Sequence, residues 1–237
     1  MRIAIISDIH SNLEALEAAL NYIHENDIDK IFCLGDIVGY GPNPNECVEL
    51  IKANCDKVIM GNHDHAVLGL TSVEYFNDFA KISTVWTAQT MTDKNKAYLA
   101  NLDFKYHSNG YCLVHATPSE PSQWHYILSE NDAFHEFTCF EQHVCFIGHS
   151  HFPIVFSKKG FSREKRIKLE KRNKYIINVG SIGQPRDGNP KACFCIYKPD
   201  KNMVEYIRLD YNMVKTREKI IKEGLPVFLA DRLTRGY

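Results

Sequence analysis

Five short motifs with potential metal ligands are spread along most of this chain. Each contains aspartate, asparagine or histidine, and several place a glycine next to the ligand. In order they are Asp8-Ile9-His10, Gly35-Asp36, Gly61-Asn62-His63-Asp64, His115 and Gly148-His149-Ser150-His151. They offer two aspartates, one asparagine and four histidines as ligands, with His63 left over. A two-metal hydrolase needs such a set to hold a hydroxide against a phosphorus atom.

Hydrolysis of a phosphate ester requires a hydroxide at neutral pH, neutralisation of the phosphoryl oxygens and a proton for the departing oxygen. Two cations about 3.5 to 4 Å apart supply the first two requirements. Asp36 is the candidate for a bridging carboxylate, because it follows a glycine at a strand end and lies between the other ligands in sequence. Mixed nitrogen and oxygen donors favour transition ions over calcium. We expect two such ions, with manganese as the first candidate and iron, zinc, cobalt or nickel as alternatives.

The first third of the chain reads as alternating strands and helices. Apolar runs predict strands at 2–7, 31–34 and 57–60, each followed by a ligand motif. Ser11-Asn12-Leu13-Glu14 matches a capping box, and Asn43-Pro44 predicts the start of a second helix. Strands that alternate with helices pair in parallel, and ligands gather at the carboxyl ends of such strands. The three early motifs are therefore expected at one edge of a sheet.

Later strands are predicted in the same way. The strand at 111–114 leads to His115, and the strand at 144–147 leads to Gly148-His149-Ser150-His151. Three more strands are expected, the last two as a hairpin, and they suggest a second sheet facing the first: 175–179, 192–197 and 204–209.

Two helical regions carry no candidate ligand. One is a flank at about 74–101, with Thr92 as a cap, and the other is a tail at about 213–232. We interpret residues 1–237 as a single domain.

The composition is that of an ordinary globular protein. With 44% hydrophobic residues among 237, the chain can bury a sizeable core, and its net charge of −1 provides no global attraction for nucleic acid or membranes. The eight cysteines form no Cys-x-x-Cys pair, so reduced core thiols are expected. The apolar stretch at the N-terminus is too short for a signal peptide, and no run approaches the roughly 18 apolar residues of a membrane span. A cytoplasmic protein is predicted.

The order and spelling of the motifs are similar to those of the calcineurin-like metallophosphoesterases, with a match at every metal-binding motif from Asp8 to His151. This resemblance implies an α/β fold, a four-layer α-β-β-α sandwich of two mixed sheets flanked by helices. It also implies the allocation of ligands: Asp8, His10 and His151 to one metal, Asn62, His115 and His149 to the other, and Asp36 to both. By the same resemblance His63 contacts the phosphate and protonates the leaving group, with Asp64 orienting it.

One position departs from two groups within that superfamily. Protein serine/threonine phosphatases and symmetrically cleaving dinucleoside tetraphosphatases carry an arginine shortly after the Gly-Asp motif, where this chain has Tyr40. A phosphoprotein substrate is therefore disfavoured. The stretches 35–42 and 178–186 instead resemble small prokaryotic phosphodiesterases grouped near the dinucleoside polyphosphate hydrolases. Tyr40 and Arg186 are candidate substrate contacts, since arginine offers a planar donor fork to phosphate.

Two further segments have alternative interpretations. The segment 158–174 holds nine basic residues against Glu164 and Glu170, so it is either a solvated hairpin or a track for a nucleic-acid backbone. The loop 117–126 has two interpretations: Trp124 or Tyr126 contacts a base or another aromatic leaving group, or Trp124 packs against neighbouring parts of the protein.

The sequence thus predicts a metal-dependent phosphodiesterase for a small phosphoester or nucleotide substrate, with a metal-bridging hydroxide as nucleophile. The alternatives are a dinucleoside polyphosphate hydrolase, a phosphomonoesterase and, on the basic segment alone, a nuclease. A different class is a protein-binding scaffold on the same fold, which the retained His63 disfavours.

Overall fold

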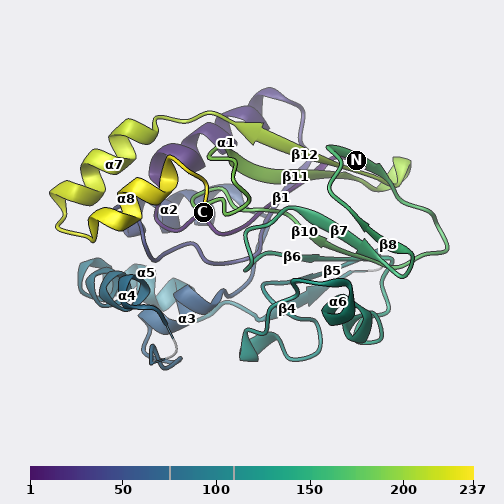
Figure 1. The fold of residues 1–237 in the computed structure, drawn as a ribbon, viewed down its shortest axis with the longest axis horizontal. Coiled ribbons are helices and arrows are strands. Elements are labelled where there is room, and N and C mark those ends of the chain that lie inside the picture. The colour runs from purple at the N-terminus through teal and green to yellow at the C-terminus, as the bar shows by residue number, and fades with distance from the viewer. Residues whose placement is uncertain (75, 109) are drawn as a thin grey trace.

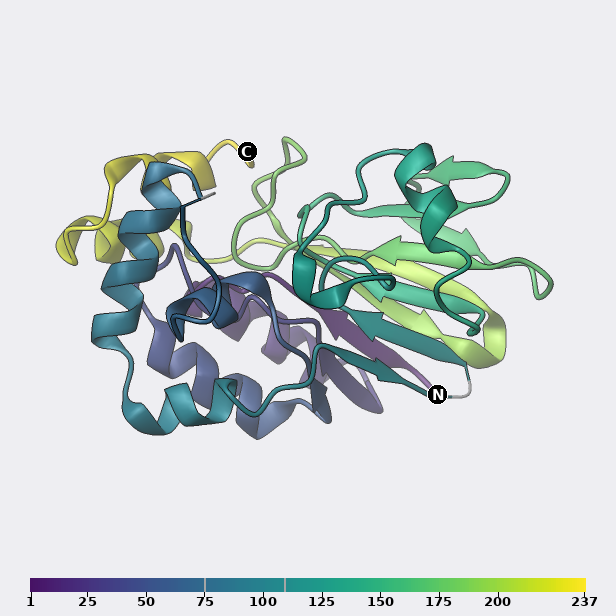
Figure 2. The same cartoon turned by 90° about the horizontal axis from the view of Figure 1, so that it is seen from below.

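The computed structural model describes residues 1–74, 76–108 and 110–237. Two mixed β-sheets of six strands each pack face to face, and helices cover their outer faces (Figure 1). The same layers are seen from below in Figure 2, where the helices of the first and last thirds lie together at one end of the sandwich. The predicted α/β fold with four layers is confirmed.

The first sheet has the strand order β3-β2-β1-β11-β12-β9. Strands β1, β2 and β3 are parallel, whereas β11, β12 and β9 add in antiparallel fashion. The bounds are β1 Ile3–Ile6, β2 Lys30–Cys33, β3 Lys57–Val58, β9 Arg166–Lys168, β11 Ala192–Lys198 and β12 Met203–Leu209.

The β11–β12 hairpin corrects one prediction, because it extends the first sheet and not a second one. Strand β11 lies antiparallel to β1, with Ile3 opposite Tyr197. The strand pattern shows that a segment is buried on both faces but not which sheet edge it joins.

The second sheet has the strand order β4-β5-β6-β10-β7-β8. Its three central strands β5, β6 and β10 are parallel, and they are the predicted strands that end at or near the later motifs. The bounds are β4 Lys105–His107, β5 Tyr111–Val114, β6 Val144–Ile147, β7 Ile154–Ser157, β8 Gly160–Ser162 and β10 Tyr175–Asn178.

The basic segment 158–174 is not a single solvated hairpin. Its first part turns from β7 into β8 at the edge of the second sheet, and its middle part forms β9 at the edge of the first sheet. The segment therefore crosses from one sheet to the other. Strands of three residues such as β8 and β9 are too short to stand out as a periodic pattern in the sequence.

The helices fill the outer layers. Those of the first half are α1 Leu13–Glu25, α2 Pro44–Asn54, α3 Asn62–Val67, α4 Asp78–Thr90 and α5 Asp93–Leu99, and those of the second half are α6 Glu130–Glu136, α7 Met213–Lys222 and α8 Val227–Leu233. Short 3₁₀ helices span Pro121–Gln123 and Pro199–Lys201. Helices α4 and α5 lie within 74–101, where Tyr75 is outside the described residues, and Thr92 caps α5 by accepting from the Asn95 N–H at 3.3 Å.

The apolar core follows the pleat of the strands. Ile3 and Ile5 face the second sheet, and side chains of both sheets fill the layer between them. Ala4 and Ile6 point the other way and pack under α1 and α2. A third cluster buries the outer face of the second sheet beneath α6. A fourth joins α4, α7 and α8 around Tyr40, so the C-terminal helices lie over the loop that follows β2.

Helix α1 begins one residue later than the capping box predicts. Its cap is Asn12, whose side chain accepts from the Ala15 N–H at 3.2 Å. Ser11 has a left-handed backbone with φ of 54°, and its N–H is bound to the Ile37 carbonyl. The loop contact between the ends of β1 and β2 overrides the local capping preference of Ser11.

Glu14 connects α1 to α7, and its charge is expected to stabilise the fold. Its buried carboxylate accepts from Lys219 Nζ at 2.6 Å and Thr216 Oγ1 at 3.0 Å. Burial opposes the charge, but these two bonds hold the pKa of Glu14 below its ordinary value of 4.5. A lowered pKa in the folded state contributes stability that is present above about pH 4.5 and is lost as the pH falls through the folded value.

We therefore expect Glu14→Gln to lower the free energy of unfolding by about 1–2 kcal/mol at pH 7. Urea unfolding at pH 7 and at pH 3.5 measures the effect, with Glu17→Gln on the same helix as the control. A difference between Glu14→Gln and wild type that stays constant down to pH 3.5 would contradict the assigned role of the carboxylate.

None of the helices in the described part of the chain has the length and apolar composition that a membrane crossing requires. All eight cysteines are free thiols, and most of them are buried.

Candidate metal centre

The predicted ligands meet at the carboxyl ends of the parallel strands of both sheets. Their backbone is unusual, because φ is positive at Asp8 (55°), His10 (47°), Asp36 (51°), His149 (67°) and His151 (62°). Such conformations are uncommon for residues with a side chain and cluster at functional sites. They turn each side chain sharply off its strand and back toward one point.

One group consists of Asp8, His10, Asp36 and His151. Each offers one ligand atom, these atoms lie within 4.8 Å of one another, and all four residues are buried. His151 Nε2 lies 3.2 Å from Asp8 Oδ1, and His10 Nε2 lies 3.7 Å from Asp36 Oδ2. The group contains the three residues predicted for one metal together with the predicted bridge.

The second group consists of Asp36, His115 and His149, again with ligand atoms within 4.8 Å. His115 Nε2 lies 3.3 Å from Asp36 Oδ2 and 3.1 Å from Asn62 Oδ1. Asp36 thus belongs to both groups. The structure brings all seven predicted ligands together, although they come from segments as far apart as Asp8 and His151.

Hydrogen bonds to backbone carbonyls fix the state of the four imidazoles. His10 Nδ1 contacts the Val38 carbonyl at 3.2 Å, and His151 Nδ1 contacts the Gln184 carbonyl at 2.5 Å. His115 Nδ1 contacts the Leu34 carbonyl at 2.8 Å. In His149 it is Nε2 that contacts a carbonyl, that of Trp124 at 2.9 Å. A carbonyl accepts only, so the ring nitrogen bound to it carries a proton. In the neutral ring the other nitrogen keeps a lone pair, which is Nε2 in His10, His115 and His151 and Nδ1 in His149.

These lone pairs face other acceptors. His10 Nε2 and His151 Nε2 are 3.1 Å apart, and His115 Nε2 faces the oxygens of Asp36 and Asn62. The backbone N–H groups of His63 and His149 donate to Asp36 and Asp8, but no side-chain donor lies between the neutral rings and these carboxylates. Such a buried cluster of acceptors is unfavourable unless a proton or a metal cation lies among them. The donor set therefore fits divalent metal ions.

The charges support the same interpretation. Burial opposes ionisation of Asp36, but His115, His63 and His10 hold its pKa well below the ordinary value. Burial lowers the pKa of His149 to about 3, with His115 adding to the effect. His115 is the exception, since Asp36 and Asp8 outweigh its burial and raise its pKa to about 9. The two carboxylates therefore stabilise a positive charge among the rings, and in the metal-free site a proton on His115 supplies that charge.

Glycines allow the motifs to approach closely. A side chain at Gly61 would collide with the Asp36 carboxylate, and one at Gly148 would collide with Ser7 Oγ and Asp8 Oδ2. The glycines of these motifs are therefore required by packing, since any Cβ there would displace a ligand.

His63 lies beside the cage and not in either group. Its ring packs against His10 at 4.9 Å, Tyr40 at 4.5 Å and Phe76 at 4.9 Å between centroids. Among the described residues its Nδ1 is buried without a hydrogen-bond partner. Burial, with Arg186 adding to it, lowers the pKa of His63 to about 4.

Asp64 binds backbone and not the His63 ring. Its carboxylate accepts from the N–H groups of Ile37 at 2.9 Å, Val38 at 3.1 Å and Gly61 at 3.1 Å. It thereby ties the loop after β2 to the start of α3, where His63 lies. Burial and the nearby Asp36 raise the pKa of Asp64 to about 7.

Tyr40 is buried beside two arginines. The guanidinium carbons of Arg186 and Arg232 lie 5.8 and 5.9 Å from the centre of its ring. Arg232 is 9% exposed, and burial, with Arg186 adding to it, lowers its pKa to about 10. Its Nε donates to the main-chain oxygen of Tyr237. Within residues 1–74, 76–108 and 110–237, no ion pair joins either guanidinium to an Asp or Glu side chain.

Arg232 was not predicted as a site residue. It lies on α8, in the tail that the sequence presents as helix without chemistry, and only the packing of α8 on Tyr40 brings it to the site. The only sequence signal for Arg232 is its place in a short, mostly apolar helical segment, and this signal is weak.

The two aromatic candidates of the loop 117–126 have different surroundings. Trp124 is packed locally, with Nε1 bound to Thr71 Oγ1 at 3.3 Å and its carbonyl bound to His149 Nε2 at 2.9 Å. Tyr126 is exposed and stacks on His149 at 3.9 Å between ring centroids. Tyr126 is thus the aromatic ring that a ligand can reach beside the cage.

The chain is similar to known proteins over most or all of its length. The model of the calcineurin-like phosphoesterase superfamily domain matches residues 1–202. An uncharacterized protein of Methanocaldococcus jannaschii is 46% identical over 99% of this chain and 98% of its own length. The crystal structure of a metallophosphoesterase from Sphaerobacter thermophilus is 36% identical and superposes with a TM-score of 0.91 over 100% of this chain and 99% of its own.

A symmetrical bis(5′-nucleosyl)-tetraphosphatase of Actinobacillus pleuropneumoniae is 28% identical over 47% of this chain and 43% of its own length. The match to the family model covers every ligand motif found here, and the relatives point to hydrolysis of phosphoesters. The chain belongs to the calcineurin-like phosphoesterase superfamily.

Proposed function

We propose that this protein is a phosphodiesterase that uses two divalent transition ions, manganese first. Asp8, His10 and His151 would hold one ion, Asn62, His115 and His149 the other, and Asp36 would contact both. Such ions supply a nucleophilic hydroxide at neutral pH and neutralise the phosphoryl oxygens when they are bound.

The buried cage of acceptors carries this proposal. When His115 is neutral, its Nε2 lone pair is directed at a carboxylate and an amide oxygen, within 3.1 to 3.3 Å. A metal ion would take the place of the proton that His115 otherwise holds there. In each imidazole of the cage one nitrogen is bound to a backbone carbonyl, which orients the rings before any ligand arrives.

His63 and Arg186 would act on the substrate. His63 is neutral at pH 7 in the metal-free protein, and it offers an N–H to a phosphoryl or leaving oxygen. Once the negative charge of a phosphoryl group lies beside it, the pKa of the imidazole rises, and the ring can take up a proton from solvent, donate it to the departing oxygen and return to the neutral form. Asp64 would keep His63 in place through the backbone, and Tyr40 would hold the guanidinium of Arg186.

Hydrolysis of aryl phosphates tests the proposal. Protein stripped of metal by chelation should be inactive toward bis(4-nitrophenyl) phosphate, and Mn²⁺ should restore activity, with iron, zinc, cobalt and nickel ions compared at equal concentration. The diester should be cleaved faster than 4-nitrophenyl phosphate. Absence of hydrolysis with every ion would favour the protein-binding scaffold, and a faster monoester would favour a phosphomonoesterase.

A second candidate is hydrolysis of dinucleoside polyphosphates. Its support is the partial similarity to the symmetrical tetraphosphatase, together with the guanidinium groups of the half-buried Arg186 and the buried Arg232, which suit a substrate with several charges. Product analysis on diadenosine tetraphosphate decides between the two candidates.

The guanidinium pair should set the affinity for anionic substrates. We expect Arg186→Gln and Arg232→Gln each to raise KM roughly tenfold, since a hydrogen bond to a charged group contributes about 1.5–3 kcal/mol. The temperature of unfolding in the presence of inorganic phosphate provides a second readout. Arg217→Gln on α7, which removes an arginine paired with Asp231, is the control. Equal KM values in all three variants would remove both arginines from the substrate site.

A further inference from the structure

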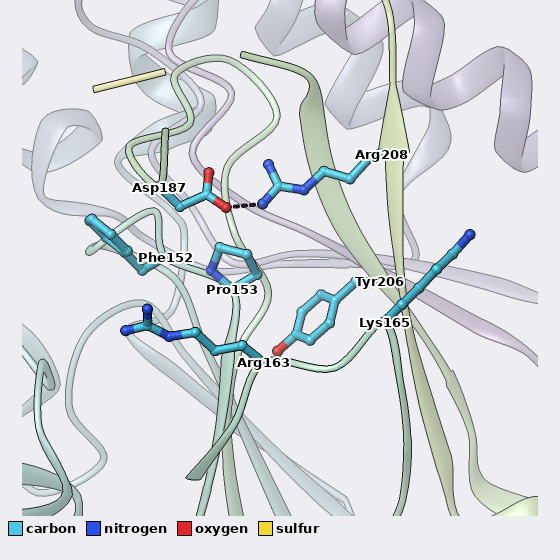
Figure 3. A pocket seen from close by; sticks show the side chains of 7 residues that line it. All are labelled: Phe152, Pro153, Arg163, Lys165, Asp187, Tyr206 and Arg208. Atoms are coloured by element: carbon cyan, nitrogen blue, oxygen red, sulfur yellow. Dashed lines mark hydrogen bonds and ion pairs between the residues drawn. The ribbon is translucent and has the colours of Figure 1, made fainter. Parts of the chain in front are cut away.

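The basic segment 158–174 contributes to a cavity that the proposed mechanism does not use. This cavity has a volume of about 350 Å³, and its lining includes Arg163 and Lys165 of that segment (Figure 3). Phe152, Tyr206 and Arg208 line it from β12 and from the chain just before β7. In Figure 3 the Arg208 guanidinium turns to the Asp187 carboxylate, and the Arg163 guanidinium extends below Phe152 without a partner among the residues drawn.

The cavity lies at the metal end of the sandwich. Phe152 directly follows the ligand His151, and Asp187 directly follows Arg186. Strand β7 begins where β10 ends, with Ile154 opposite Asn178. Tyr206, in the cavity wall, donates to the Asn178 carbonyl at 2.8 Å, and Asn178 Nδ2 in turn donates to Ser150 Oγ at 2.9 Å. The wall of the cavity is thus bonded to the loop that carries two metal ligands.

A second cavity of about 280 Å³ adjoins the first and shares Phe152 and Arg163 with it. Its lining is mostly apolar, with Ile127, Leu128 and Ile154, and it includes Ser150. Cavities of this size accept an organic molecule and are much larger than a single phosphate ion requires.

Charge and shape together indicate the ligand. The first cavity has three cations, Arg163, Lys165 and Arg208, against the one carboxylate of Asp187. Arg163 and Lys165 form no ion pair among the residues the structure describes. Cations beside an aromatic ring and an apolar cavity are the features that bind phosphate and stack on a base.

We propose that the two cavities bind a nucleotide unit of the substrate next to the scissile bond, with its base in the apolar cavity and its own phosphate beside Arg163 and Lys165. This inference rests on the proposed function and specifies its substrate class: a nucleotide diester that carries a second phosphate.

Two matched dinucleotides test the inference. One is a deoxyadenosine dinucleotide with a 5′-terminal phosphate, and the other is the same dinucleotide without it. With Mn²⁺, the wild type should prefer the phosphorylated form by roughly tenfold in kcat/KM, the size expected for one charged contact. The double variant Arg163→Glu with Lys165→Glu should lose that preference and cleave the two dinucleotides with nearly equal kcat/KM.

The double variant Lys158→Glu with Lys171→Glu is the control, because it changes the charge of the same segment equally at exposed positions outside both cavities. It should keep the preference. Equal rates on both dinucleotides in the wild type, or equal losses in the two double variants, would overturn the inference, even where bis(4-nitrophenyl) phosphate is cleaved.

Binding of adenosine 5′-monophosphate separates this inference from the proposed function. Calorimetry on the metal-free wild type and on the Lys158 and Lys171 control should detect binding, and the Arg163 and Lys165 variant should bind at least roughly tenfold more weakly. No binding to the wild type would overturn the inference whether or not any ester is hydrolysed. If the Arg163 and Lys165 variant lost binding of an oligonucleotide but kept binding of the mononucleotide, these residues would belong to a nucleic-acid-binding surface, and the inference of a nucleotide site would be overturned.

Discussion

We expect the His63→Ala variant to keep its metal and to lose most of its activity, with kcat toward an aryl phosphodiester lower by about 10²- to 10⁴-fold. His63 belongs to neither ligand group, so its removal leaves the cage complete. Burial, with Arg186 adding to it, lowers the pKa of its imidazole to about 4. An anionic substrate beside the ring would raise that pKa, so the imidazole could then act as an acid. Metal content by elemental analysis and kcat on the same preparation give the two measurements.

The exposed His24 on α1 provides the control, since His24→Ala removes an imidazole far from the cage. A His63→Ala variant with unchanged kcat would exclude His63 from catalysis. One that loses both ions would place its role in the cage.

The Asp36→Asn variant is expected to have the second large effect, through the metals themselves. Asp36 Oδ2 lies 3.7 Å from His10 Nε2 and 3.3 Å from His115 Nε2, so its charge serves both groups. Asparagine preserves the shape but removes that charge. Because a metal ion contributes several kcal/mol to such a reaction and each 1.4 kcal/mol is a factor of ten, we expect kcat/KM to fall by about 10³-fold or more.

Titration of the metal-free variant with Mn²⁺ should show weaker binding of both ions. The pKa of His115 should also fall from about 9, because Asp36 is the principal group that raises it against burial. Asp103→Asn, at an exposed position paired with Lys57, makes the same chemical change away from the cage and should bind metal normally. Retention of two tightly bound ions by Asp36→Asn would exclude a bridging role.

Much of the site could be predicted from the sequence because its ligands follow strands. Asp8, Asp36 and His115 each come directly after or near an apolar run, and parallel strands bring their carboxyl ends to one edge. The residue types then restrict the chemistry, since imidazole, amide and carboxylate groups in this number suit transition ions.

Other features required long-range packing. The sequence pattern of the hairpin of β11 and β12 would be the same in either sheet. Only the pairing of β11 with β1 shows that it belongs to the first sheet. Ser11 looks like a helix cap, but its N–H is taken by Ile37 across the loops. The basic segment looks like one solvated hairpin, but β9 pairs with β12.

The sequence by itself therefore determined the α/β class and the seven candidate ligands that the structure brings together, because both follow from local patterns of apolar and polar residues. The tertiary structure alone decided the protonation of the imidazoles, since this depends on carbonyls such as those of Leu34 and Gln184 in distant loops. It also decided the arrival of Arg232 at Tyr40 and the cavity around Arg163, because side chains from separate elements meet there only after the sheets and helices have packed.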